Sequence, residues 1–412
     1  MKRIERYYLG SNMLDALAGS SAGLITQLIV VNQLGFTGTN LGILSSLSII
    51  LYLVSAIPIG KMVDALQPAT VLISALVVKA LLLVTLTFLY ISGGLSFWTV
   101  LILQVLQSLT GIFIDNSQVI NAVSIQSLTG ESKLVPRLES ADKAVGIIAP
   151  GVVALFAAGE FYKEGYIGSA VLVLIALLMI AFPVKKMLNR AVADVEATND
   201  SSRCEKGVAE EYDDSILAGF RLVARSRESL VPVLLIAAGN FGLAYIDSPK
   251  TLFLLREIEM SPSGFSSLKI VSAIAGLIAS LLSVWLIERL NFAQLVTIAT
   301  LGQVFSTLAF LIVIILNIPA FTFTAISNAI WSASVVLINI SAMNFFVSKL
   351  PEGRVGIGLS SMRTLVMLVV PVGSLLGGYC ADHVGYAFSA ATWSTMSFAT
   401  FIIAASLFLK RR

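Results

Sequence analysis

The sequence is poor in residues that bind metals or form disulfides. It contains one histidine, His383, and two cysteines, Cys204 and Cys380. Cys204 falls in a charged stretch and Cys380 near the end of an apolar one, so a disulfide framework is not expected. No spacing typical of a metal site is present. We therefore expect neither a metal nor any other cofactor.

Charged residues are also scarce, at 12% of 412 residues, about half their share in soluble domains. The sequence has no Gly-Lys-Ser/Thr nucleotide loop and no histidine cluster. These absences argue against an enzyme and exclude ATP-driven pumping by this chain alone. A nucleic-acid partner is not expected.

Long apolar runs are abundant instead. Hydrophobic residues make up 57% of the sequence, and the runs reach the length of about 20 residues that crosses a bilayer. Between turn and charge signals they predict twelve membrane spans with short connectors. Their limits are 9–32, 40–60, 69–91, 97–120, 140–159, 166–184, 230–254, 263–287, 293–316, 321–346, 355–379 and 386–408.

Basic residues gather in alternate connectors, whereas the opposite connectors hold little beyond Lys163 and Arg256. By the positive-inside rule, both termini are expected in the cytoplasm. The basic start of the chain is interpreted as the flank of the first span, not as a cleaved signal peptide. The residues behind this orientation are Lys2, Arg3, Arg6, Lys61, Lys133, Arg137, Lys143, Arg289, Lys349, Arg354, Lys410, Arg411 and Arg412.

One connector, residues 185–229, is long and charged. Its tract 194–214 has low hydrophobicity, and residues 214–226 mix apolar and basic positions at helical period. This pattern is typical of an amphipathic helix on the inner membrane surface. The predicted domains are therefore 1–184, a six-span bundle, then the linker 185–229, then 230–412, a second six-span bundle.

The two halves repeat each other. A Ser-Lys-Leu segment precedes both the fifth and the eleventh span, and each of these spans carries a proline near glycine, at Pro150-Gly151 and at Pro371 with Gly373. Parallel repeats of six spans are a known transporter architecture.

The sequence resembles the major facilitator superfamily (MFS) of transporters, particularly its macrolide- and multidrug-efflux-like branch. The resemblance is carried by Gly60-Lys-Met-Val-Asp64, Val135-Pro-Arg137, Pro150-Gly151 and Pro351-Glu-Gly-Arg354, in that order. It implies an all-α membrane protein, with two pseudo-symmetric six-helix bundles around a central cavity. It also implies a monomer whose first, fourth, seventh and tenth spans line that cavity.

A polar stripe runs along the fourth span. Its members, Gln104, Gln107, Gly111, Asp115 and Gln118, recur every three or four residues and so share one helix face. An acid at membrane depth costs roughly 2.5–3.5 kcal/mol on insertion scales. Such a face is expected to meet water, a partner or a substrate.

Three other spans carry polar faces that agree with this cavity. The predicted substrate-binding residues are Asn12 and Thr26 in the first span, Gln104, Gln107 and Gln118 in the fourth, Asn240 and Tyr245 in the seventh, and Asn328, Trp331 and Asn339 in the tenth. Spans six and twelve lack Asp, Asn, Gln, Lys and Arg in their interiors.

Acidic residues are the candidates for proton coupling: Asp15, Asp115 and Asp247. At about 1.5 Å rise per residue, Asp15 and Asp115 both fall in the cytoplasmic third of the membrane. Two nearby carboxyl groups away from water can share a proton, which allows exchange of a proton for substrate. The alternative is that each acid only accepts hydrogen bonds from neighbouring helices.

Charged residues near the membrane surfaces are candidates for gates. Asp247, Lys250 and Lys269 fall in the outer third, where an ion pair would close the cavity; a static pair that reaches toward the headgroups is the alternative. The resemblance adds Asp64, Glu288 and Arg289 at the inner side. For Lys79 and Arg363 we expect structural pairing with helix ends or acids.

The sequence thus predicts a proton-coupled antiporter that exports small amphipathic molecules by alternating access, in the cytoplasmic membrane of a bacterium. Its partners would be a small-molecule substrate, protons and the lipid bilayer. Three acids with few obvious cations favour neutral or cationic substrates. The alternatives are a dedicated exporter or importer of one metabolite (a siderophore, lipid or nutrient), or a membrane scaffold or sensor that transports nothing.

Overall fold

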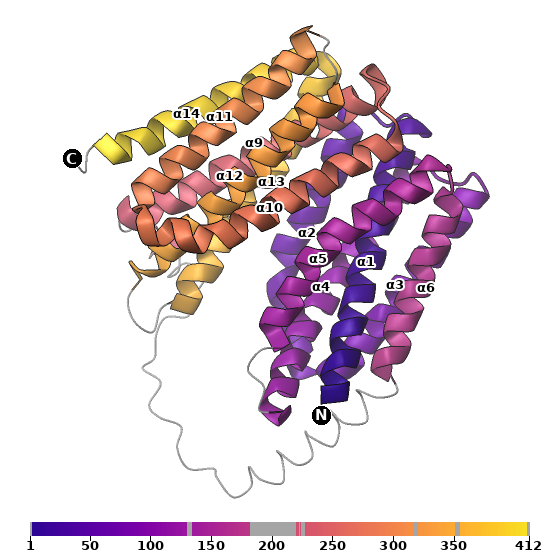
Figure 1. The fold of residues 1–412 in the computed structure, drawn as a ribbon. Coiled ribbons are helices and arrows are strands. Elements are labelled where there is room, and N and C mark those ends of the chain that lie inside the picture. Colours follow the sequence, from indigo (N-terminus) through magenta and orange to yellow (C-terminus); the bar gives the residue numbers. More distant parts are fainter. Residues whose placement is uncertain are drawn as a thin grey trace, which may run out of the picture. The chain divides into compact units, whose positions relative to one another are not determined.

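The protein is built from long helices (Figure 1). The computed structural model describes residues 2–129, 134–181, 220–221, 223, 227–316, 320–350 and 355–409. Within these ranges, 12 helices are long and apolar enough to cross a membrane. The predicted all-α fold and its spans are confirmed, and the protein is a multi-pass integral membrane protein.

The helices follow the predicted spans closely. In the first half they are α1 (Lys2–Asn32), α2 (Gly38–Ala65), α3 (Pro68–Ile91), α4 (Phe97–Thr129), α5 (Leu134–Ala158) and α6 (Tyr162–Met179). In the second half they are α9 (Arg227–Leu252) with the π-helix η2 (Phe253–Glu257), α10 (Pro262–Arg289), α11 (Phe292–Leu316), α12 (Ala320–Val347), α13 (Val355–His383) and α14 (Tyr386–Leu409).

Local sequence explains where these helices begin and end. Gly35 and Gly93 adopt φ of 66° and 69° in the connectors before α2 and α4, a conformation that glycine reaches without steric cost. α3 has Pro68 in its first turn. α10 has Pro262 there as well, and the Ser261 hydroxyl caps it by accepting from the Gly264 amide at 3.1 Å.

Most of the predicted linker lies outside the described residues. This holds for the amphipathic helix at 214–226, except Phe220, Arg221 and Val223, and for the segment 351–354. The predicted boundaries at 184 and 230 therefore remain a prediction.

Packing divides the chain into two compact units. Unit 1 contains Met1–Gln27 and Val54–Tyr212, and unit 2 contains Leu28–Leu53 and Asp213–Arg412. In unit 1, α3 packs against α4 and α6. In unit 2, α13 packs against α9, and α12 against α10 and α11. The end of α1 and the first half of α2 thus belong, by their packing, with the second-half helices.

Many large apolar side chains remain exposed on the helices. Leu155 on α5 is 77% exposed and Leu281 on α10 is 71% exposed. Apolar surface of this extent is unfavourable in water but suits acyl chains. Interiors contain smaller and polar side chains, such as Ser306 and Ser327, whose hydroxyls exchange hydrogen bonds between α11 and α12.

The C-terminal part of α9 departs from a regular α-helix. Pro249 has no N–H to donate to the carbonyl of Tyr245, four residues earlier, and its ring crowds that carbonyl. Helix α13 meets α9 here through glycine: a Cβ on Gly377 would overlap the Tyr245 carbonyl group. A few residues later α9 continues as η2. Pro249 therefore lies close to a tight crossing of α9 with α13.

Candidate functional site

In unit 1, four helices bring charged and polar groups together inside the membrane-spanning region. The Asp15 carboxylate on α1 pairs with the Lys79 ammonium on α3 at 2.7 Å. One turn earlier on α1, the Asn12 amide donates to the Asp142 carboxylate on α5 at 3.1 Å. Asp15 and Asn12 are buried, whereas Asp142 is exposed.

Asp115 on α4 completes this group, which we call the acid cluster: Asn12, Asp15, Lys79, Asp115 and Asp142. Its carboxylate lies within electrostatic range of Lys79, Asp15 and Asp142. The side chain is exposed, and its carboxylate has no hydrogen-bonding or ion-pair partner in the part of the chain that the structure describes. Asp15 and Asp115 therefore have different surroundings. Asp15 is paired with a lysine, whereas Asp115 is open, by which we mean exposed and without a partner among the described residues.

The backbone of α1 makes room for the lysine. A Cβ on Gly19, one turn after Asp15, would lie 3.1 Å from the Lys79 ammonium nitrogen. The ammonium also donates to the Asp15 backbone carbonyl at 3.3 Å. The predicted pairing of Lys79 with an acid is confirmed, although its place in the cluster was not foreseen. Arg363 is exposed on α13.

Lys79 and Asp142 are the site residues that sequence reasoning missed. The sequence contained a signal for Lys79, because a lysine inside the apolar third span requires a partner. Asp142 follows the Val-Pro-Arg segment and falls at the start of the predicted fifth span, where it was given no role. Only the crossing of α1 with α5 places it beside Asn12.

The other predicted residues of unit 1 lie on α4 and α1. Gln104, Gln107 and Gln118 are partly buried on α4, and the Tyr8 hydroxyl donates to the Gln118 backbone carbonyl at 2.5 Å. The Thr26 hydroxyl donates to the Ala22 carbonyl at 2.7 Å and lies 2.9 Å from the Tyr166 hydroxyl on α6. These contacts already satisfy Thr26.

In unit 2, the three charged residues predicted for the outer third separate into two arrangements. Asp247 on α9 and Lys269 on α10 form a wide ion pair, 4.0 Å long, with both side chains nearly half exposed. The Lys250 ammonium instead donates to the Asn328 side-chain oxygen on α12. Lys250 therefore extends into the helix bundle and is not part of that ion pair.

Around these residues lies a cavity of about 270 Å³, which we call the α9–α12 cavity. Asp247, Lys250, Lys269, Asn328 and Trp331 line it, together with apolar side chains and Trp393 of α14. Several predicted substrate-binding residues of unit 2 lie elsewhere. The Asn240 amide donates to the Val366 carbonyl on α13 at 3.1 Å, Tyr245 is buried and stacked on Phe241, and Asn339 is partly buried on α12.

Two of the three residues predicted to form the inner gate, Glu288 and Arg289, are exposed. The Asp64 side chain lies outside the described part of the structure. The Arg289 guanidinium lies over the Trp285 ring, 4.3 Å from its centroid.

Unit 2 contains a contact network that was not predicted. The Asp382 carboxylate at the end of α13 accepts from the Gly38 and Thr39 amides at 2.6 and 2.7 Å and from the Thr39 hydroxyl at 2.6 Å. It therefore caps the first turn of α2. Nearby, the Arg256 guanidinium donates to the Val31 carbonyl at 2.6 Å. The sequence signal was an acid beside the single histidine at a span end.

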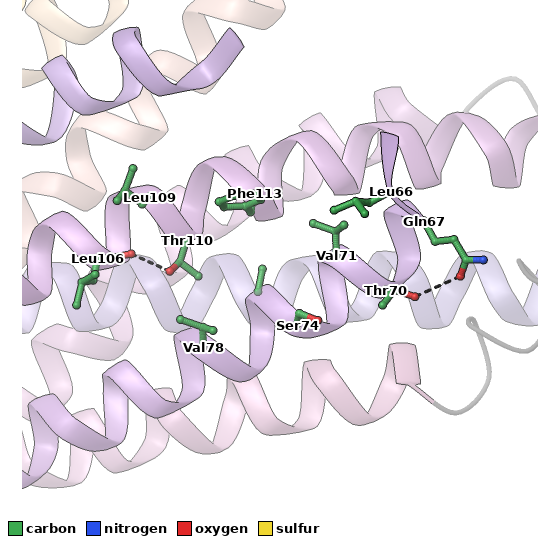
Figure 2. A pocket seen from close by; sticks show the side chains of 11 residues that line it. Leu66, Gln67, Thr70, Val71, Ser74, Val78, Leu106, Leu109, Thr110 and Phe113 are labelled. Atoms are coloured by element: carbon green, nitrogen blue, oxygen red, sulfur yellow. Dashed lines mark hydrogen bonds between the residues drawn. The ribbon is translucent and has the colours of Figure 1, made fainter. Parts of the chain in front are cut away.

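A larger cavity, about 580 Å³, lies between the end of α2, α3 and α4 (Figure 2). Its walls are mostly apolar, and two of its few polar groups bond close by: the Thr110 hydroxyl donates to the Leu106 carbonyl at 2.7 Å and the Thr70 hydroxyl to the Gln67 side chain at 3.4 Å. A space of this chemistry suits acyl chains and offers no groups for specific recognition.

Comparison with solved structures shows the fold. The nucleoside transporter NupG matches with a TM-score of 0.69 at 16% identity, covering 98% of this chain and 99% of that chain. A bacterial homologue of the human lysosomal transporter Spinster gives 0.69 at 14%, with 100% and 99% coverage. A D-xylose-proton symporter gives 0.68 at 12%, with 97% and 95% coverage. No curated protein matches the sequence.

The family assignment comes from the sequence profile. The profile described as Major Facilitator Superfamily matches residues 8–372, which include the acid cluster and the α9–α12 cavity lining except Trp393. The architecture of the solved structures agrees with it. This protein therefore belongs to the Major Facilitator Superfamily and is a membrane transporter.

Proposed function

We propose that this transporter is a proton-coupled antiporter that exports small amphipathic molecules from a bacterial cell. The observation that carries the proposal is the acid cluster, in which one carboxylate is paired and another is open. An open acid inside a membrane protein marks an ion or substrate pathway by default. The resemblance to the efflux-like branch supports export over import.

The chemistry follows from the different partners of the two acids. Asp115 can gain and lose a proton without breaking an ion pair, whereas Asp15 must first release Lys79. Each time Asp115 becomes charged, it competes with Asp15 for the Lys79 ammonium. Protonation of Asp115 would thus be linked to the position of Lys79, and through it to the packing of α1 against α3.

Alternating access requires contacts that form at one side and break at the other. The Asp382 cap on α2 and the Arg256–Val31 hydrogen bond are suited to this role. Both join the first-half segment Leu28–Leu53 to second-half helices. A polar contact of this kind can be replaced by water when the outer side opens, so it costs little to break.

The test uses purified protein in proteoliposomes with an imposed pH gradient and a panel of fluorescent amphipathic dyes. Wild-type protein should accumulate dye against its gradient, and a protonophore should abolish this. Asp115→Asn should lose gradient-driven transport but keep exchange of dye down its own gradient. Glu164→Gln, which changes an exposed acid in the first turn of α6, serves as the matched control.

The outcomes separate the candidate functions. Full gradient-driven transport by Asp115→Asn would remove this residue from the coupling step. Accumulation in right-side-out vesicles, but not in inside-out ones, would identify an importer instead. A wild-type protein that moves no dye but one class of metabolite would favour the dedicated carrier.

A further inference from the structure

The α9–α12 cavity contains a lysine without a counter-ion. The Lys250 ammonium has a neutral amide, Asn328, as its hydrogen-bond acceptor, and it lies 5.1 and 5.7 Å from the ring centroids of Phe310 and Trp393. The nearby acid, Asp247, is paired with Lys269. No carboxylate of the described residues lies within ion-pair distance of Lys250. Aromatic faces and an amide stabilise a cation, but much less than an anion does in the same place.

Two further donors in the cavity wall are also unused. The indole N–H groups of Trp331 and Trp393 have no acceptor among the residues that the structure describes, although the side chains are only 7% and 1% exposed. Buried tryptophans normally find a partner for this group. The two rings lie 4.6 Å apart, and both side chains line the cavity.

The charges of the lining point to the same kind of ligand. Two lysines and one aspartate line the cavity, which leaves one positive charge uncompensated. One carboxylate would neutralise this excess, whereas a doubly charged phosphate would overshoot it. Apart from Asn328, Thr251, Ser272 and Ser332, the rest of the wall is apolar, including Leu243, Ile246 and Phe265. A volume of about 270 Å³ is slightly below the range of drug-sized pockets.

We propose that this cavity binds the carboxylate of a compact amphipathic organic acid, and that such acids are the transported substrates. The carboxylate accepts from Lys250 and from the indole N–H groups of Trp331 and Trp393, and the apolar body lies along the tryptophan rings and Phe265. This inference rests on the proposed transport function and replaces the expectation of neutral or cationic substrates. The proposal differs from that expectation because sequence position assigned Lys250 to an outer gate, whereas the helix packing directs it into the bundle.

Binding is tested with three probes of the same shape and different charge. Cyclohexanecarboxylate, cyclohexanecarboxamide and cyclohexylamine are titrated into purified wild-type protein, with calorimetry and tryptophan fluorescence as readouts. The carboxylate should bind at least tenfold more tightly than the amide, because hydrogen bonds to charged groups are the stronger ones. Its binding should change the tryptophan emission, since two of the donors are indoles.

Variants locate the site. Lys250→Gln should weaken carboxylate binding at least tenfold and reduce the preference over the amide, and Trp331→Phe should weaken it to a smaller extent. Lys163→Gln, an exposed lysine in the first turn of α6, is the control and should bind normally. If Lys250→Gln does not fold, the comparison of the three probes on wild-type protein still decides the question.

Several results would overturn the inference. These are equal binding of carboxylate and amide, tighter binding of the amine, no carboxylate binding at millimolar concentration, or unchanged binding by Lys250→Gln. Failure here is distinct from failure of the proposed function, because binding requires no gradient. A protein that binds the carboxylate but ignores the pH gradient keeps the inference and loses proton coupling. A protein that pumps cationic dyes and binds no carboxylate loses the inference and keeps the proposed function.

Discussion

At the scale of single residues, this protein places charges inside the membrane region in two different ways. The Asp15 carboxylate and the Lys79 ammonium neutralise each other at 2.7 Å, with side-chain exposures of 7% and 17%. Lys250 instead rests on an amide and aromatic rings. The charges of the Asp15–Lys79 pair cancel, whereas the Lys250 ammonium has no anionic partner among the described residues. This difference is why we assign a structural and coupling role to one lysine and a binding role to the other.

The Asp15–Lys79 pair yields a stability prediction. Lys79→Gln leaves the Asp15 charge without a partner, and removing one member of a buried pair costs about 3–5 kcal/mol. The double variant Asp15→Asn/Lys79→Gln removes both charges and should regain most of that loss. Thermal unfolding of the purified proteins in detergent measures both, and Lys163→Gln is again the exposed control.

The double variant should still lack gradient-driven transport, since the competition for Lys79 is gone. A double variant as unstable as Lys79→Gln alone would show that the pair is not the reason for the loss. The lysine would then have another essential contact.

At the scale of elements, helix ends and helix crossings carry the informative contacts. α13 approaches α9 at Gly377 and meets α2 at the other side, where a Cβ on Gly42 would lie 2.5 Å from the Ser374 carbonyl oxygen. Small residues at such positions let membrane helices pack backbone to backbone. The Ser46 hydroxyl adds a bond to the Pro371 carbonyl at 2.8 Å. α13 is therefore the element through which α2 and α9 are joined.

The Asp382 cap gives a prediction at this scale. Asp382→Asn removes the negative charge from the first turn of α2 and one of two equivalent acceptor oxygens. Loss of such a cap costs about 1 kcal/mol, so amide exchange at Gly38 and Thr39 should become about fivefold faster. Hydrogen exchange followed by mass spectrometry of peptides covering residues 36–45 measures this.

Glu257→Gln changes an exposed acid at the end of η2 and should leave the exchange unchanged. Equal exchange in Asp382→Asn and wild type would show that the carboxylate does not hold the start of α2. The proposed outer contact would then reduce to the Arg256–Val31 bond.

At the scale of the whole molecule, composition determines where the protein resides. Exposed leucines such as Leu155 and Leu281 cover the helices, and the part of the chain that the structure describes contains 12 candidate spans. The distribution of lysine and arginine between alternate connectors predicts the orientation, with both termini in the cytoplasm.

The orientation can be tested with fusions in a bacterial host. Green fluorescent protein joined after Arg412 should fluoresce, because it folds in the cytoplasm, and alkaline phosphatase at the same place should be inactive. Alkaline phosphatase inserted in the connector 33–37 should be active. The opposite pattern at both places would invert the topology and, with it, the depths assigned to Asp15 and Asp115.

Sequence reasoning succeeded where the signal was local. The twelve apolar runs became helices with ends near their predicted limits, because backbone polar groups in hydrocarbon must be satisfied within each span. The sequence also indicated that Lys79 needs a partner such as an acid, because it lies inside an apolar span. The partner of Asn12 was not, because Asp142 lies 130 residues away and meets it only through the crossing of α1 with α5.

The sequence by itself determined that this chain is helical, crosses a membrane many times and carries polar groups that hydrocarbon does not tolerate alone. These properties depend on composition and on helical period, which each segment carries within itself. The tertiary structure decided which polar groups meet. It paired Asp15 with Lys79, left Asp115 without a partner, placed Asp382 at the start of α2 and turned Lys250 toward Asn328, Phe310 and Trp393. Those outcomes depend on how helices distant in sequence cross, and no single segment contains that information.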